Sequence, residues 1–238
     1  MLYIIGLGLN IKGISLEGTE AIKKCKKIYL ENYTVDFPYT EGEINELVGK
    51  KLELAEREFI EGLSIIDEAK KKDVALLVYG SPLTATTHIT LLQECKESGI
   101  KCKLIYSSSI FDAVAESGLQ LYKFGKIASM PAWKKSYEPD SFMEIVKENK
   151  SIKAHTLILV DIGLDFQDAL KQLEISAKKY EIGLKKLIIC QQIGTRRGKI
   201  MYREIEELRE WEGVQKPYCL IIPGKLHHVE QEVLKGFG

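Results

Sequence analysis

The chain has 238 residues, of which 45% are hydrophobic and 29% are charged, as expected for a globular protein with one large domain or two small ones. Its 34 Lys and Arg residues balance 34 Asp and Glu residues, which argues against a broad surface for nucleic acid or for an anionic membrane. The five dispersed cysteines form no C-x-x-C pair, so no metal site is expected, and no apolar run is long enough to span a membrane. The odd, dispersed cysteine count fits a reducing compartment, and with neither a membrane span nor a basic region before the first apolar run the sequence predicts a cytoplasmic protein.

Predicted strands and helices alternate along the first half of the chain. This alternation favours a parallel sheet with helices on both faces. The predicted strands are Leu2–Leu7, Lys27–Glu31, Lys51–Leu54, Asp73–Tyr79 and Lys101–Tyr106. The predicted helices are Leu16–Lys24, Glu41–Val48, Arg57–Lys71 and Thr84–Ser98, and a further helix, Ile110–Ser117, follows this half.

The second half has a looser pattern, and we predict a domain boundary between residues 108 and 109. The two predicted domains are therefore α/β domains over residues 1–108 and 109–238. In the second, the predicted strands are Lys126–Met130, His155–Asp161, Leu187–Gln191, Lys199–Tyr202 and Cys219–Ile222. The predicted helices are Ser141–Asn149, Asp165–Glu181, Glu204–Trp211 and His227–Leu234.

Small or turn-forming residues follow six of the predicted strands. The apolar strand before Gly80 is an example, since Gly80 removes a side chain that would block the approach of a ligand and Pro82 biases Ser81 away from helix. Taken alone, this is an ordinary strand-to-helix connection. Ligands of open α/β sheets bind beyond the carboxyl ends of the strands, so six such ends predict a long cleft shared by two α/β halves. The ends are Gly6–Gly8, Gly80–Pro82, Ser107–Ser109, Asp161–Gly163, Gly194–Thr195 and Pro223–Gly224.

Motifs for other chemistries are missing or incomplete. The sequence has no full G-x-G-x-x-G fingerprint, P-loop, nucleophile elbow or H-E-x-x-H motif, and Glu31 is the nearest candidate for an acidic residue that ends a second strand. We interpret His155 as a satisfied polar residue at a strand start. His227 and His228 follow a Pro-Gly turn, where capping or a partner contact is favoured over catalysis.

Six segments occur in the order GLGL, GSPLTATTH, SSSIF, GLQLYKFGK, HTLILVDI and IIPGKLHHVE. This order resembles the tetrapyrrole-methylase superfamily of S-adenosylmethionine-dependent methyltransferases. Within it, the segments ATTH, LYKFGK and PGKLH are similar to the diphthine synthase subfamily, and the similarity covers nearly the whole chain.

The resemblance implies an α/β protein whose two α/β domains enclose a cofactor cleft, assembled as a homodimer. It implies S-adenosyl-L-methionine as cofactor, S-adenosyl-L-homocysteine as product, and translation elongation factor 2 as protein substrate. The reaction implied is methylation of the amine of a 3-amino-3-carboxypropyl group on a histidine, which needs no metal and no covalent intermediate; no catalytic residue is identified. The implied cofactor contacts are Leu9, Ser81, Thr84, Ser109, Ile110, Val160, Ile193 and Tyr218.

Two departures from the family pattern leave alternatives open. Ser81 stands where the family has Asp, and Gln191–Gly194 stands where it usually reads Ala-Arg-Ala-Gly. If the Asp mainly shapes the turn, Ser can replace its hydrogen bond to the backbone, so we expect binding to be retained. The alternatives are a methyltransferase for a small tetrapyrrole or corrin precursor, and a cofactor-binding relative with weakened turnover.

Overall fold

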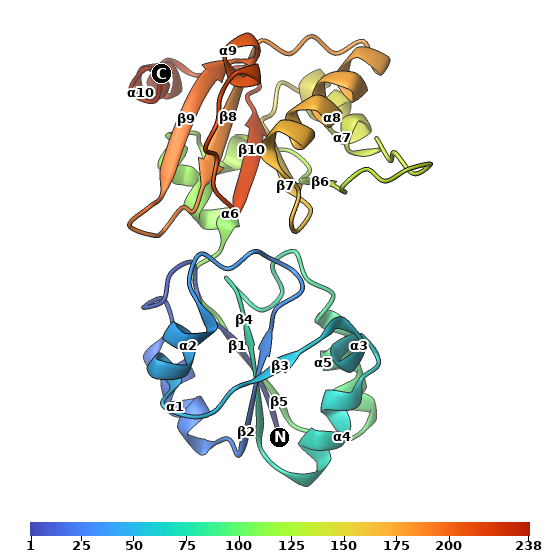
Figure 1. Ribbon diagram of the computed structural model, residues 1–238, viewed down its shortest axis with the longest axis vertical. Coiled ribbons are helices and arrows are strands. Elements are labelled where there is room, and N and C mark those ends of the chain that lie inside the picture. Colours follow the sequence, from blue (N-terminus) through green and yellow to red (C-terminus); the bar gives the residue numbers. More distant parts are fainter. The chain divides into compact units, whose positions relative to one another are not determined.

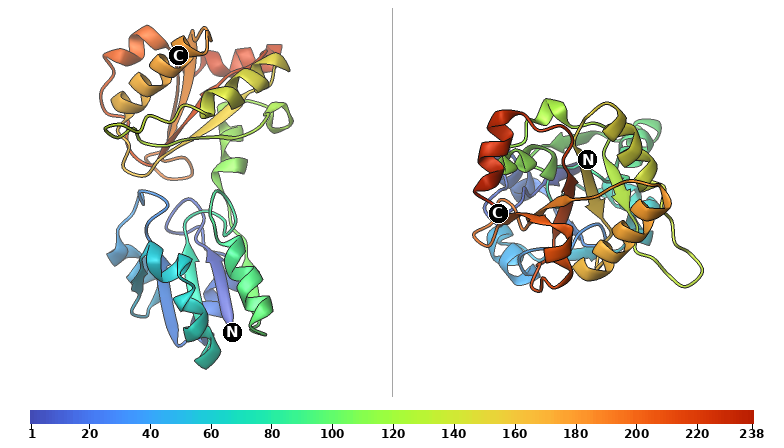
Figure 2. Two further views of the ribbon diagram at one scale, coloured as in Figure 1. Left: turned by 90° about the vertical axis from the view of Figure 1, so that its right-hand side faces the viewer. Right: turned by 90° about the horizontal axis from the view of Figure 1, so that it is seen from above.

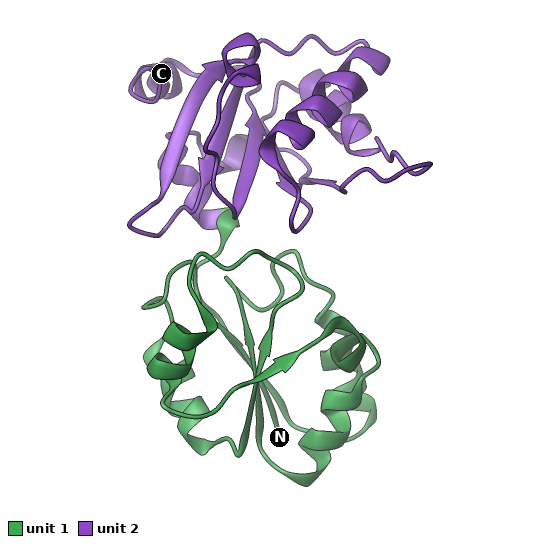
Figure 3. Ribbon diagram, in the orientation of Figure 1, with its two compact units in different colours: residues 1–111 green, residues 112–238 purple.

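The computed structural model describes residues 1–238, which divide into two compact units, Met1–Phe111 and Asp112–Gly238 (Figure 3). Each unit combines one five-stranded sheet with helices, so the predicted α/β class is confirmed. The sequence-based boundary between residues 108 and 109 falls just before this division. None of the helices is both long and apolar enough to cross a membrane.

Five parallel strands form the sheet of unit 1 (Figure 1). In spatial order they are β3 (Glu53–Ala55), β2 (Lys27–Glu31), β4 (Val74–Val78), β1 (Leu2–Gly6) and β5 (Cys102–Ile105). Every residue of β4 is apolar and fully buried, as expected for a parallel strand that is covered on both faces.

Helices cover the two faces of this sheet separately (Figure 1). One face carries α1 (Leu16–Lys24) and α2 (Glu41–Val48), and the other carries α3 (Arg57–Glu61), α4 (Ser64–Lys71) and α5 (Ile89–Glu97). Successive side chains of a strand point to opposite faces, so Ile5 of β1 packs with the first group and Ile4 with the second. The connection after β1 therefore leaves toward one face and the connection after β4 toward the other.

The helix predicted over residues 57–71 is two helices, α3 and α4. Leu63 separates them with a φ of 64°, a left-handed conformation through which a right-handed helix does not continue. Both helices still bury their apolar residues against the same face of the sheet, so the break does not change the packing of this segment.

The helix predicted over residues 84–98 begins only at Ile89. Thr86 Oγ1 donates to the carbonyl oxygen of Pro82 at 2.8 Å, and His88 Nδ1 lies 3.2 Å from the same oxygen. Such side-chain bonds to a nearby carbonyl compete with helical pairing, and they hold this segment as a compact loop. We call it the 81–88 loop.

The sheet of unit 2 is mostly antiparallel. In spatial order its strands are β6 (Ala128–Met130), β7 (Thr156–Val160), β10 (Tyr218–Ile222), β8 (Lys186–Gln191) and β9 (Lys199–Glu204). β6 is parallel to β7, whereas β10 is antiparallel to both of its neighbours, β7 and β8. One end of this sheet therefore holds the ends of β7 and β8 with the start of β10, and we call it the β7–β8 carboxyl end. The opposite end, where β10 finishes and β7 begins, is the β10 carboxyl end.

The helices of unit 2 follow from its apolar patterning. They are α6 (Ile110–Ala113), which spans the boundary, the 3₁₀ helices η1 (Val114–Ser117) and η2 (Leu121–Lys123), and α7 (Phe142–Ser151), α8 (Phe166–Lys179), α9 (Ile205–Arg209) and α10 (His228–Lys235). Phe142 of α7 and Leu170 of α8 pack against the sheet in one apolar core. α10 lies on the other side of the sheet from α7 and α8 (Figures 1 and 2).

Candidate functional site

The carboxyl ends of β1 and β4 lie side by side in unit 1, and the chain leaves them toward opposite faces of the sheet. In open α/β sheets this divergence opens a crevice in which ligands bind. The turns after β4, β1 and β5 meet there, at the end of the unit opposite to the N-terminus (Figure 2). This carboxyl end is therefore the candidate binding site of unit 1.

The backbone locks two of these turns together. Gly8 and Gly80 each donate an amide hydrogen bond to the carbonyl oxygen of the other, both at 3.0 Å. Their φ angles are 72° and 69°, which residues with a side chain rarely adopt. A Cβ atom on Gly6 would lie only 2.6 Å from the oxygen of Gly80. The geometry thus requires glycine at all three positions.

Gly80 is needed for a different reason from the one that the sequence suggested. A Cβ atom there would lie 3.8 Å from the nearest atom outside its chain neighbours, the oxygen of Ser108, which is an ordinary contact. The positive φ is what selects glycine at position 80. The close approach occurs at Gly6 instead.

Ser81 and Thr84 form the turn that follows Gly80. The Thr84 amide donates to the Ser81 carbonyl oxygen at 3.0 Å, so the backbone alone closes this turn. Ser81 is 9% exposed, and its hydroxyl has no partner within the chain. A side chain at position 81 is therefore not needed to shape the turn, and this hydroxyl is available to a ligand.

His88 anchors the 81–88 loop from inside the unit. It is 1% exposed, its Nδ1 lies against the Pro82 carbonyl, and its Nε2 has no partner within the chain. Burial lowers the pKa of His88, although Glu31, the Pro82 carbonyl and Glu61 act in the opposite direction. The ring is therefore neutral at neutral pH. The sequence did not single out this histidine, because its partner is a carbonyl oxygen that no motif contains.

The remaining predicted contacts of unit 1 follow β1 and β5. Leu9 is 4% exposed, and its carbonyl oxygen accepts from the Tyr79 hydroxyl at 3.3 Å. Ser109 is also buried, and its Oγ accepts from the Phe111 amide at 3.2 Å as α6 begins at Ile110. The five predicted positions of unit 1 thus follow three neighbouring strands, and their role as ligand contacts stays a prediction.

Glu31 serves the turn that follows β2. Its buried carboxylate accepts from the Tyr33 amide at 3.0 Å, from the Thr34 amide at 2.9 Å and from the Thr34 hydroxyl at 2.7 Å. These bonds satisfy the carboxylate within its own turn. Its role in this structure is to hold that turn.

In unit 2, the predicted contacts lie together at the β7–β8 carboxyl end. Val160 ends β7, Ile193 follows β8, and Tyr218 begins β10 directly opposite Gln191 of β8. Ile193 and Tyr218 are buried, and the Tyr218 hydroxyl donates to the Leu164 carbonyl oxygen at 3.2 Å. The structure brings these three positions to one end of one sheet, while their contact with a ligand stays a prediction.

One of the six predicted strand ends is misplaced. Asp161–Gly163 and Gly194–Thr195 both lie at the β7–β8 carboxyl end, as the cleft prediction requires. Pro223–Gly224 lies at the β10 carboxyl end instead, because β10 is antiparallel to β7 and β8. The prediction that all the strand ends of this half share one cleft is therefore wrong for Pro223–Gly224.

A buried carboxylate organises the β10 carboxyl end. Glu230 is fully buried and accepts from the amides of Gln120 at 3.0 Å and His227 at 2.7 Å, from His155 at 3.1 Å and from the Lys123 ammonium. Burial alone would raise the pKa of Glu230, but these four hydrogen bonds outweigh it and lower the pKa to about 2. Glu230 thus ties three separate segments together as a carboxylate.

His155 completes this network as a neutral ring. Its Nδ1 accepts from the Gly224 amide at 2.9 Å, so the ring proton is on Nε2, which donates to Glu230. Burial lowers the pKa of His155 in spite of the nearby Glu230 carboxylate. The prediction that His155 is a satisfied polar residue is confirmed. No sequence pattern indicates the role of Glu230, because its partners are far apart in the chain.

Known proteins match this chain along most of its length. Residues 1–209 match the family described as Tetrapyrrole (Corrin/Porphyrin) Methylases. The chain belongs to this family. The predicted resemblance is thereby confirmed, and the chain is a methyltransferase.

Several relatives of this methylase are called diphthine synthases or diphthine methyl ester synthases. The chain is 37% identical over 251 residues to diphthine synthase of Methanocaldococcus jannaschii, and the match covers 99% of this chain and 98% of that protein. It is 44% identical over 170 residues to diphthine methyl ester synthase of Schizosaccharomyces pombe, covering 70% of this chain and 60% of that protein. A crystal structure described as a diphthine synthase of Entamoeba histolytica has a TM-score of 0.89 and 33% identity, with 100% of this chain and 98% of that chain covered.

Proposed function

We propose that this methyltransferase uses S-adenosylmethionine to methylate the amine of a 3-amino-3-carboxypropyl group on a histidine of translation elongation factor 2, a step of diphthamide biosynthesis. We further propose that it works in the cytoplasm as a homodimer. The observation that carries the proposal is the similarity to diphthine synthase of M. jannaschii, because it extends over 99% of the chain.

The carboxyl end of unit 1 has the properties that such a cofactor needs. Ser81 offers a hydroxyl with no partner within the chain, so a ligand can bond it without displacing another group. Leu9 and Ile110 are apolar residues of this end, and its glycines let the turns after β1 and β4 pack directly against each other. The proposed cofactor contacts are Leu9, Ser81, Thr84, Ser109 and Ile110 of unit 1 and Val160, Ile193 and Tyr218 of unit 2.

The proposed reaction is a displacement at a methyl carbon. S-adenosylmethionine, when bound, supplies a methyl group on a positively charged sulfur; the unprotonated substrate amine forms the new N–C bond as the C–S bond breaks, and the amine proton leaves to solvent. The residues of this chain contribute alignment and the exclusion of water, with reacting atoms about 3–3.5 Å apart. Catalysis by positioning agrees with the absence of nucleophile and dyad motifs from the sequence.

Transfer of a labelled methyl group tests this proposal against its alternatives. The chain is incubated with methyl-labelled S-adenosylmethionine and, in separate reactions, with a corrin precursor or with elongation factor 2 carrying the 3-amino-3-carboxypropyl histidine. Label is expected in the elongation factor alone. Label in the corrin precursor alone would contradict the proposed substrate, and cofactor binding without any transfer would indicate a relative with weakened turnover.

A further inference from the structure

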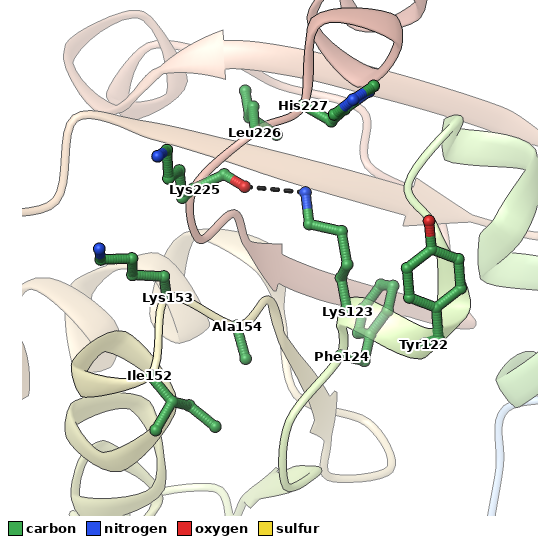
Figure 4. A pocket seen from close by; sticks show the side chains of 9 residues that line it. All are labelled: Tyr122, Lys123, Phe124, Ile152, Lys153, Ala154, Lys225, Leu226 and His227. Carbon is green, nitrogen blue, oxygen red and sulfur yellow. Dashed lines mark hydrogen bonds between the residues drawn. The ribbon is translucent and has the colours of Figure 1, made fainter.

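A pocket of about 460 Å³ lies at the β10 carboxyl end of unit 2 (Figure 4). Residues 122–124, 152–154 and 225–227 line it. The first and last of these ranges belong to the LYKFGK and PGKLHH segments. The pocket therefore lies at the opposite end of the sheet from Val160 and Tyr218, and the proposed cofactor contacts leave it unexplained.

The lining of this pocket is positively charged. It contains three lysines and a histidine but no carboxylate. Lys123 is neutralised by the buried Glu230, whereas Lys153 and Lys225 form no ion pair within the chain. The Lys225 amide donates to the Lys153 carbonyl oxygen at 3.1 Å, so these two lysines come from adjacent backbone segments. Two uncompensated cations thus share one pocket in a chain whose formal net charge is zero.

The buried network beneath the pocket fixes its shape. Lys123 bonds the Glu230 carboxylate and also donates to the Lys225 carbonyl oxygen at 2.8 Å, the bond drawn in Figure 4. His155, which directly follows residues 152–154, donates from Nε2 to the same carboxylate at 3.1 Å. These bonds connect the three lining segments through Glu230 within the folded unit, so the pocket does not depend on a ligand for its shape.

Large apolar side chains stand at the rim of this pocket. Tyr122 is 81% exposed and Ile152 is 70% exposed, and both belong to the lining. Tyrosine is enriched in protein–protein interfaces, whose central part buries apolar side chains. A free small anion would use the lysines but would leave these two side chains in water.

We infer that this pocket docks an acidic segment of the protein substrate, an inference that rests on the proposed function. Lys153 and Lys225 pair with carboxylates of the segment, while Tyr122 and Ile152 cover its apolar side chains. The site holds the protein and takes no part in methyl transfer, because it lies at the other end of the sheet from the proposed cofactor contacts of unit 2.

Charge reversal in the pocket tests this assignment. The variant with Lys153→Glu and Lys225→Glu is compared with a control carrying Lys171→Glu and Lys178→Glu, two exposed lysines of α8 that undergo the same change of charge. The pocket variant is expected to weaken binding of elongation factor 2 and to raise KM about tenfold or more, with kcat and the affinity for S-adenosylhomocysteine unchanged. Tyr122→Ala is expected to raise KM in the same way, and the control is expected to behave as the wild type.

Each other outcome overturns the inference for a separate reason. Unchanged KM and unchanged binding in the pocket variant would show that the pocket does not dock the substrate, while methylation by the wild type would leave the proposed function standing. An equal loss in the control would indicate a general effect of charge. A changed sedimentation coefficient of the pocket variant would make a second copy of the chain the occupant. A wild type that neither binds nor methylates the elongation factor would overturn the proposed function together with the inference.

Discussion

Replacing Gly80 with valine is expected to weaken the affinity for S-adenosylhomocysteine by a factor of more than about one hundred. Gly80 has a φ of 69° and exchanges two hydrogen bonds with Gly8, so a β-branched residue there must shift the turn to relieve its strain. That shift carries Ser81 and Thr84 with it. Calorimetric titration of the folded variant with S-adenosylhomocysteine measures the effect.

Gly99→Val is the matched control for this variant. Gly99 has nearly the same φ, 67°, but it follows α5 at the other end of the sheet, and a Cβ atom there would meet nothing within 4 Å. Both variants should lose a similar free energy of unfolding, about 1–3 kcal/mol, from strain alone. Gly99→Val should nevertheless bind S-adenosylhomocysteine like the wild type. Wild-type affinity in Gly80→Val would contradict the placement of the cofactor at this end of unit 1.

Glu230→Gln is expected to lower the free energy of unfolding by about 3 kcal/mol or more, because it removes the buried partner of Lys123. The neutral amide also disturbs the contacts with His155 and with the amides of Gln120 and His227. Urea denaturation of wild type and variant at neutral pH measures the loss. Glu232→Gln is the control, since the Glu232 side chain is 68% exposed and its ion pair with Lys235 should contribute less than about 1 kcal/mol.

The effect of Glu230→Gln should depend on pH with a defined sign. The pKa of Glu230 is lowered from 4.5 to about 2 in the folded protein, so its stabilising contribution is present above the higher value and is lost as the pH falls toward the lower one. The difference between wild type and variant should therefore shrink as the solution is acidified through this range. A difference that stayed constant or grew would contradict an ionised Glu230 in the folded chain.

The sequence alone predicts the strands well, because burial on both faces leaves a direct pattern. The five apolar residues from Val74 to Val78 cannot be read as an amphipathic helix, and the structure buries them as β4. The residue at which α5 begins cannot be predicted in this way. The bonds of Thr86 and His88 to a single carbonyl oxygen decide it, and such geometry does not follow from residue types.

For the candidate sites too, the sequence predicts what depends on local pattern and does not predict what depends on the topology of the sheet. Positions after the parallel strands of unit 1 share one end of the sheet automatically, so Leu9, Ser81 and Ser109 could be grouped from the sequence. The direction of the strands in unit 2 does not follow from their composition, so the sequence alone places Pro223–Gly224 at the wrong end of the sheet. Likewise, the pairing of Glu230 with His155 joins residues far apart in the chain, and only the folded sheet brings them together.

The names of the relatives differ in whether they mention an ester, and analysis of the product can show whether this chain forms one. The relative from M. jannaschii is called a diphthine synthase, and the one from S. pombe a diphthine methyl ester synthase. A methyl ester requires methylation of a carboxylate, whereas the reaction proposed for this chain methylates an amine. Mild alkali cleaves an ester and leaves N-methyl groups in place, so treatment of the product with base separates the two.

Mass spectrometry of the modified histidine of elongation factor 2 tests the central claim most directly. The factor, already carrying the 3-amino-3-carboxypropyl group, is incubated with the chain and S-adenosylmethionine, digested, and analysed before and after mild alkali. We expect the histidine peptide to gain the mass of added methyl groups, with those on nitrogen surviving alkali and with no gain when S-adenosylmethionine is omitted. An unchanged histidine peptide, or a gain that alkali removes completely, would contradict methylation of the amine by this protein.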